Sequence, residues 1–173
     1  HFFDIRKDSK AMFQGLRISE DRELCDEWMN QWPVLFLTFK DVNGLTFASA
    51  KEMLLNRIAE IYNDHSYLLE GPQIRENDRK EQLADEVSGN PTDAMLKTSI
   101  ALLMKLMWGY YGKPVILLLD EYDVPIAKAS ANGYYAEMLE IIRGMLSTAL
   151  KDNDAMRFAV ITGCLRIAKE SIF

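Results

Sequence analysis

The chain has 173 residues, of which 49% are hydrophobic and 27% charged, a composition typical of one soluble globular domain. The formal net charge of −6 argues against a surface that coats nucleic acid, because phosphate contacts need clustered lysines and arginines. The sequence has no apolar run of membrane length and no visible signal peptide, and its two cysteines lack metal-ligand spacing; we therefore expect a reduced, cytoplasmic protein.

The two ends of the sequence look cut. It opens on His1-Phe2-Phe3 without an initiator methionine and stops at Phe173, just after the start of a helical pattern. We therefore expect residues 1–173 to form a single partial domain that is truncated at both ends. Phe2 and Phe3 suit the tail of a helix, and residues 19–32 have the amphipathic pattern of a helix that packs on a sheet.

Three apolar runs, residues 33–39, 115–119 and 157–163, predict buried strands. Residues 48–63, 95–108 and 134–150 repeat their apolar side chains at helical spacing, so they predict helices between the strands. Residues 65–91 are rich in charge and predict a long connection with a short exposed helix. Strands joined through helices predict an α/β fold with a parallel sheet.

Acidic residues follow the second strand directly. Val115 to Leu119 run into Asp120, Glu121 and Asp123, and ligands of open α/β sheets bind beyond the carboxyl ends of the strands. An Asp-Glu pair at this place is typical of a Walker B segment, in which Asp120 would hold Mg²⁺ through a water molecule and Glu121 would orient or deprotonate the attacking water. The alternative is an acidic turn that only solvates the loop or caps the next helix.

The third strand also ends in a polar residue. Thr162 precedes Gly163, and Arg166 follows three residues later. A polar side chain at the end of the strand beside an Asp-Glu strand can sense the γ-phosphate of a nucleotide. An ordinary strand end with a glycine turn explains the same residues equally well.

Several segments together resemble a known family. They are Gln31-Trp-Pro-Val-Leu-Phe-Leu-Thr-Phe-Lys-Asp41, Val115-Ile-Leu-Leu-Leu-Asp-Glu-Tyr-Asp-Val-Pro-Ile126, Gly133-Tyr-Tyr135 and Ile161-Thr-Gly-Cys-Leu-Arg-Ile-Ala-Lys-Glu-Ser-Ile-Phe173. The sequence is similar in these segments to the bacterial AAA-ATPase-like domain family, P-loop ATPases of the AAA or STAND type that often carry a PD-(D/E)xK nuclease-like domain further along the chain. The similarity runs over almost the whole sequence.

The resemblance implies a P-loop NTPase sheet with an additional strand, in the order 5-1-4-3-2. Residues 33–39, 115–119 and 157–162 would then be strands 2, 3 and 4, which are neighbours in that sheet. ATP and Mg²⁺ are the implied cofactors. We assign Asp120 and Asp123 to cofactor binding, with Asp120 the Mg²⁺ carboxylate, and Glu121, Thr162 and Arg166 to catalysis, with Thr162 the sensor and Arg166 a phosphate or sensor arginine.

The sequence departs from the family at the phosphate-binding loop. The family begins with Arg-Pro-Arg-Arg-Phe-Gly-Lys-Ser, and these 173 residues contain no Gly-x-x-x-x-Gly-Lys-Ser/Thr motif. Phe2 and Phe3 would end the helix that follows this loop. Because the backbone N–H groups and the lysine of such a loop meet most of the phosphate charge, we expect residues 1–173 alone to bind ATP weakly or not at all.

These observations leave three hypotheses. The first is the core of a Mg²⁺-dependent ATPase that carries Walker B and sensor segments without a Walker A loop. The second is a degenerate, non-catalytic module that mediates protein contacts. The third is a metal-dependent nuclease, which would need a lysine after an acidic pair on one strand, and the sequence lacks it. If strand 1 is absent, the third strand has an open edge, so we also expect self-association, or else a strand supplied by a segment upstream of His1.

Overall fold

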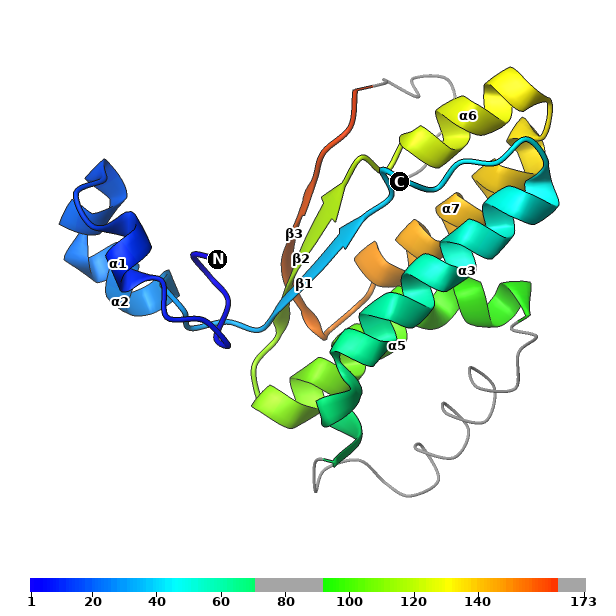
Figure 1. The fold of residues 1–173 in the computed structure, drawn as a ribbon. Coiled ribbons are helices and arrows are strands. Elements are labelled where there is room, and N and C mark those ends of the chain that lie inside the picture. Colours follow the sequence, from blue (N-terminus) through cyan, green and yellow to red (C-terminus); the bar gives the residue numbers. More distant parts are fainter. Residues whose placement is uncertain (71–91, 165–173) are drawn as a thin grey trace.

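The structure is a computed structural model, and it describes residues 1–70 and 92–164 (Figure 1). These residues form a three-stranded parallel sheet and the helices that connect and cover it. The α-helices are α1 (Lys10–Phe13), α2 (Arg22–Trp28), α3 (Phe47–Asp64), α5 (Asp93–Tyr111), α6 (Val124–Asn132) and α7 (Tyr135–Leu150); the strands are β1 (Val34–Thr38), β2 (Val115–Asp120) and β3 (Met156–Ile161); and the 3-10 helices are η1 (Arg17–Glu20) and η2 (Ser66–Glu70).

The three predicted strands are neighbours, in the order β1-β2-β3, as expected. All of them run parallel, because each connection contains at least one helix. The central strand β2 has the longest apolar run and is buried over most of its length. This arrangement confirms an α/β fold with an all-parallel sheet, and it is compatible with a P-loop-like fold.

Four helices, α3, α5, α6 and α7, cover one face of the sheet (Figure 1). The core lies between them and the strands, and each strand contributes alternate residues to it, such as Leu35 and Leu37 of β1 and Leu117 and Leu119 of β2. The helices predicted between the strands are confirmed here. Thr92 caps the start of one of them, α5, by accepting a hydrogen bond from the backbone N–H of Met95 at 3.3 Å.

The N-terminal segment, residues 1–32, covers the amino end of the opposite face of the sheet. Phe3 contacts Trp28 and Phe158 edge-on or nearly so, with ring centroids 6.0 and 5.8 Å away. Trp28 stacks on Trp32 at 5.4 Å, and the guanidinium of Arg157 on β3 lies 5.5 and 5.3 Å from the centroids of these two rings. Aromatic packing thus joins this segment to β3.

One prediction for the N-terminal segment is wrong, and another is confirmed in part. Phe2 and Phe3 are not in a helix, and the residue after them, Asp4, forms a β-bridge with Trp32. The helix expected over residues 19–32 forms only as the short α2, preceded by η1, and Leu24 is 37% exposed. It still packs on the sheet through Trp28, whose ring centroid lies 5.9 Å from that of Phe158 on β3.

A buried polar network also holds this segment to α3. Asp4 is 6% exposed and accepts two hydrogen bonds from the guanidinium of Arg6, each 3.1 Å long. Nη1 of Arg6 lies 3.3 Å from Nε2 of the buried His65, and Nδ1 of His65 lies 2.8 Å from the carbonyl oxygen of Ile61. Because a guanidinium can only donate, Nε2 must accept and the proton of neutral His65 sits on Nδ1.

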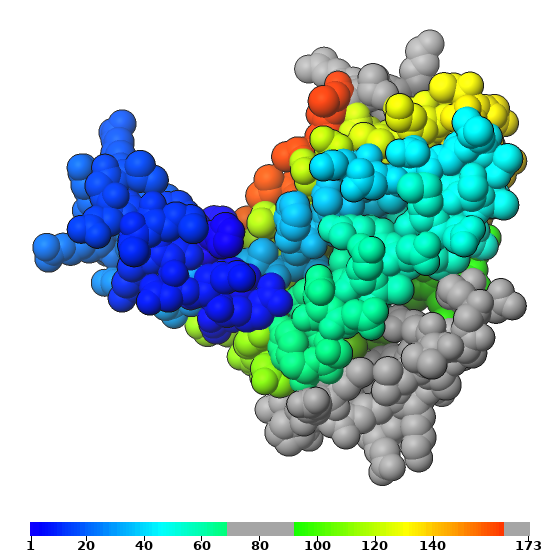
Figure 2. Space-filling model, in the orientation of Figure 1, coloured from blue at the N-terminus to red at the C-terminus, as the bar shows by residue number. Residues whose placement is uncertain are grey.

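On the face of the sheet opposite the helices, the part that residues 1–32 do not cover is open. Phe36, Leu118 and Val160 lie side by side in register on the three strands, and Phe36 and Val160 are 52% and 46% exposed. Figure 2 shows the molecule hollowed between the N-terminal segment and β3. The prediction that β3 is a buried strand is therefore wrong: β3 pairs with β2 only, among the described residues, and its burial would require a further neighbour.

Other predictions fall on residues that the structure leaves undescribed. Most of the charged connection, residues 71–91, and the C-terminal residues 165–173 are outside the described ranges. Among the helices that are described, none has both the length and the apolar character needed to cross a bilayer.

Candidate functional site

The candidate site lies at the carboxyl edge of the sheet, where polar residues end all three strands. Thr38 of β1 is in register with Asp120 of β2, and the backbone N–H of Phe39 donates to the carbonyl oxygen of Asp120 at 3.0 Å. On the other side of β2, the backbone N–H of Thr162 donates to the carbonyl oxygen of Leu119 at 2.8 Å. The sheet ladder thus places Thr38, Asp120 and Thr162 in one row.

A hydrogen bond joins two of the predicted site residues. Oγ1 of Thr162 donates to Oδ1 of Asp120 at 2.5 Å, which is the short distance expected of a hydroxyl that donates to a charged carboxylate. Thr162 is exposed and Asp120 is half-buried. Both are two residues beyond members of the open apolar row, so both side chains lie on the uncovered face of the sheet.

Glu121 has an unusual backbone conformation. Its φ is +53°, in the left-handed region that residues with a Cβ adopt rarely and at a cost of about 1–2 kcal/mol. The turn is fixed on both sides, because the N–H of Tyr122 donates to the carbonyl oxygen of Thr162 at 3.3 Å and the N–H of Val124 donates to that of Glu121 at 3.2 Å. Strain of this kind is common at functional sites.

The acidic pair is not neutralised by cations. Within residues 1–70 and 92–164, neither Asp120 nor Glu121 takes part in an ion pair. In the described part of the chain, the Thr162 hydroxyl is the one donor to the carboxylate of Asp120, and Glu121 is half-buried. The two carboxylates therefore have no cationic partner among these residues.

Asp123 lies differently from the other acids. It is 3% exposed, and its Oδ2 accepts a hydrogen bond from the backbone N–H of Cys164 at 2.9 Å. Burial raises the pKa of the neighbouring Tyr122 phenol, and the negative charge of Asp123 raises it further. The side chain thus faces the loop that follows β3, not the open edge beside Asp120.

The described residues offer few ligands for a metal ion. No group of three or more His, Cys, Asp or Glu side chains in that part of the chain could hold one. Mg²⁺ commonly keeps several waters and binds proteins through one or two carboxylates, so the half-buried carboxylate of Asp120 beside the Thr162 hydroxyl fits this ion. The site is therefore suited to a hydrated Mg²⁺ bound together with a ligand.

Sequence reasoning missed Thr38 as part of the row. The signal was its position as the one polar residue in the apolar run of residues 33–39. Its carbonyl oxygen accepts a hydrogen bond of 3.3 Å from Nε of Arg57 on α3, and Arg57 also pairs with Glu60 at 3.0 Å. Arg166, which was predicted to join the site, lies outside the described residues.

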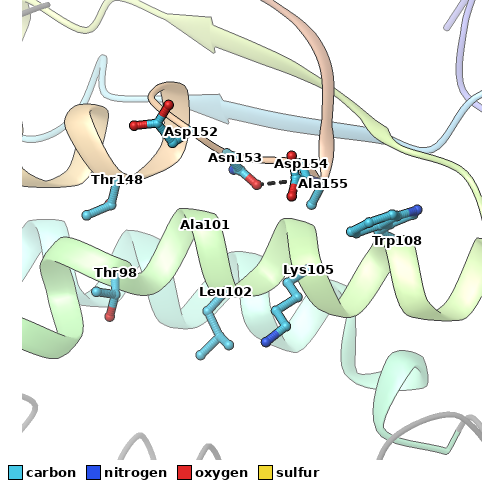
Figure 3. Close-up of a pocket in the computed structure, with 10 residues that line it drawn as sticks. All are labelled: Thr98, Ala101, Leu102, Lys105, Trp108, Thr148, Asp152, Asn153, Asp154 and Ala155. Carbon is cyan, nitrogen blue, oxygen red and sulfur yellow. Dashed lines mark hydrogen bonds between the residues drawn. The ribbon is translucent and has the colours of Figure 1, made fainter.

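A cavity lies at another place in the molecule. A pocket of about 430 Å³ opens between α5 and the loop from α7 to β3, and Figure 3 shows Trp108 and Lys105 of α5 on one side and Asp152, Asn153 and Asp154 on the other. Ala155, which also lines it, immediately precedes β3. The pocket is therefore at the amino end of the sheet, away from Asp120.

Comparison with known proteins assigns the family. A family model described as "Predicted AAA-ATPase" matches residues 1–173, which is the whole sequence. Neither the curated proteins nor the solved structures that were searched include a significant match. Because this family model matches the whole sequence, and the described residues form a parallel α/β fold, the chain belongs to the AAA-ATPase-like family.

Proposed function

We propose that this chain is the core of a Mg²⁺-dependent ATPase of the AAA or STAND type. The observation that carries the proposal is the 2.5 Å hydrogen bond from Thr162 to Asp120, because it joins the end of an Asp-Glu strand to the polar end of its neighbour. The membership of the AAA-ATPase-like family supports the same function. Among the described residues, the face of the sheet beside these side chains is open, with Phe36 and Val160 exposed, and this supports a nucleotide and a phosphate-binding loop on that face.

Each residue of the site would have a distinct role. Bound Mg²⁺ would neutralise charge on the phosphates, and Asp120 would hold it through a water molecule. Glu121 would orient or deprotonate the attacking water, and the strained turn fixes its backbone for that task. Thr162 would report the state of the γ-phosphate to Asp120, and Arg166 would contact phosphate.

We also propose that β1, β2 and β3 are strands 2, 3 and 4 of a 5-1-4-3-2 sheet. In that order the open outer edge of β3 receives strand 1, with its phosphate-binding loop, from elsewhere in the polypeptide. The half-exposed side chains of β3 support this assignment. The free thiols of Cys25 and Cys164 support a reducing, cytoplasmic location.

The test compares ATP turnover in a polypeptide that also carries a phosphate-binding loop. We expect Mg²⁺-dependent hydrolysis, and we expect Glu121→Gln to lower kcat by about 100-fold or more while ATP binding is largely kept. Glu137→Gln, on an exposed turn of α7, is the matched control. Unchanged turnover in Glu121→Gln would remove Glu121 from its role.

A second candidate function is a non-catalytic module that mediates protein contacts. The specific observation in its favour is the edge of β3, which has no strand beside it among the described residues, together with the exposed side chains of Val160 on β3 and Phe36 on β1. This module would bind partners, or a second copy of the chain, and would bind no ATP even with a phosphate-binding loop supplied. Calorimetry with Mg²⁺-ATP on that longer polypeptide distinguishes the two functions.

A further inference from the structure

Asp123 connects the ends of two neighbouring strands. It caps α6 as the residue before Val124, and its carbonyl oxygen accepts the N–H of Ala127 at 2.9 Å. Its carboxylate reaches in the opposite direction, where Oδ2 accepts the N–H of Cys164 in the loop after β3. One buried side chain thus bonds the turn after β2 to the loop after β3.

Gly163 allows the two loops to lie in direct contact. A Cβ atom at this position would come within 2.7 Å of Oδ1 of Asp123 and within 2.8 Å of Cε1 of Tyr122. Such distances are far below a normal carbon contact, so any larger residue would push the loops apart. Asp123 and Gly163 therefore form a close-fitting pair.

This pair lies next to the Thr162 hydroxyl. The carbonyl oxygen of Thr162 accepts a hydrogen bond from the N–H of Tyr122 at 3.3 Å, and its hydroxyl donates one to Asp120 at 2.5 Å. The bond from Cys164 to Asp123 fixes the chain two residues later. Without it, the backbone bonds of Thr162 to Leu119 and Tyr122 remain, but the loop directly after Thr162 is released from the turn, and the Thr162 hydroxyl is held less firmly.

We infer that Asp123 is a positioning residue that holds Thr162 against Asp120, and not a ligand of the nucleotide or the metal. This inference rests on the proposed ATPase function for its effect on turnover. It replaces the role in cofactor binding that the sequence alone suggests for Asp123. The 3% exposure of the side chain and its bond to a backbone N–H carry the inference.

The substitutions Asp123→Asn and Asp123→Ala separate the two roles. Asparagine keeps an oxygen that can accept the Cys164 N–H but removes the charge that a metal would need. Alanine removes the acceptor altogether. Asp26→Ala, at an exposed position of α2, is the matched control for loss of an aspartate.

The first readout needs no nucleotide. In the 173-residue chain, we expect amide hydrogen exchange at residues 162–164 to be about tenfold faster in Asp123→Ala and close to wild type in Asp123→Asn and Asp26→Ala. Gly163→Ala disturbs the same contact from the other loop and should also speed exchange there. It keeps the test decisive if Asp123→Ala fails to fold. Unchanged exchange in Asp123→Ala, or in Gly163→Ala in its place, would overturn the inference.

The second readout is ATP turnover in the polypeptide with a phosphate-binding loop. We expect Asp123→Ala to lower kcat by about tenfold with little change in KM, and Asp123→Asn to recover most of the loss. An equal loss in both variants, with more Mg²⁺ needed for half-maximal rate, would make Asp123 a cofactor ligand and overturn the inference. If wild type hydrolyses no ATP, the proposed function fails, while the exchange measurement still decides whether Asp123 fixes the loop.

Discussion

The left-handed backbone of Glu121 predicts that its replacement by glycine stabilises the fold. A residue with a Cβ loses about 1–2 kcal/mol in this region, whereas glycine adopts it freely. Glycine also gains about 0.4–1 kcal/mol of extra freedom in the unfolded chain, which opposes the benefit. The difference predicts that Glu121→Gly is more stable than Glu121→Ala by about 0.5–1 kcal/mol.

The comparison with alanine isolates the backbone, because both variants lack the carboxylate. The free energy of unfolding is measured by urea titration followed by circular dichroism, and the difference corresponds to about 1–4 °C in Tm for a chain of this size. The same pair of substitutions at Asp26, inside α2, is the control. There glycine should be the less stable variant by about 0.5–1 kcal/mol.

A result in which Glu121→Ala equals or exceeds Glu121→Gly in stability would refute this reasoning. It would mean that the turn after β2 does not hold φ near +53° in solution. Confirmation would show that the chain retains strain at the residue proposed for catalysis.

Three further predictions concern pH, packing and association. Burial lowers the pKa of His65 below 6.5; the Ile61 carbonyl opposes this shift and the charge of Arg6 reinforces it. Below about pH 6.5 the unfolded chain therefore binds more protons than the folded chain. The free energy of unfolding should fall as the pH drops through that value. Urea titrations between about pH 5 and 8 should show this slope, and an unchanged slope in His65→Gln would assign it to other groups. Leu117→Ala should cost about 2–5 kcal/mol in the same assay, whereas Leu45→Ala, at a side chain that is 83% exposed, should change stability by no more than about 0.5 kcal/mol. Light scattering after gel filtration should find the 173-residue chain self-associated at micromolar concentrations, and Val160→Lys should make it monomeric, because a lysine protects a strand edge; a monomeric wild type would contradict this proposal.

The sequence predicts the framework of the fold well because the strands have one dominant signal. A continuous apolar run favours a strand of a helix-covered sheet, so residues 33–39 and 115–119 could be identified as strands without knowing their neighbours. The order of the strands followed from the family resemblance. The half-exposed state of β3 could not be predicted from its own residues, because the burial of a strand depends on what lies beside it.

The candidate site was predicted less completely, for a similar reason. Asp120 and Thr162 were identified as strand ends, and the sheet register brings them within hydrogen-bond distance. The burial of Asp123 and its bond to Cys164 join positions 41 residues apart, and no local pattern encodes such a contact. The roles of Glu121 in catalysis and of Arg166 in phosphate contact remain predictions.

The stacked pair of Trp28 and Trp32 gives the molecule an internal optical reporter. These are two of its three tryptophans, and they sit where the N-terminal segment meets β3, under the guanidinium of Arg157. In a Trp108→Phe variant, all indole emission would come from this junction. Its fluorescence and its near-ultraviolet dichroism would then follow detachment of residues 1–32 separately from melting of the helical layer on the opposite face.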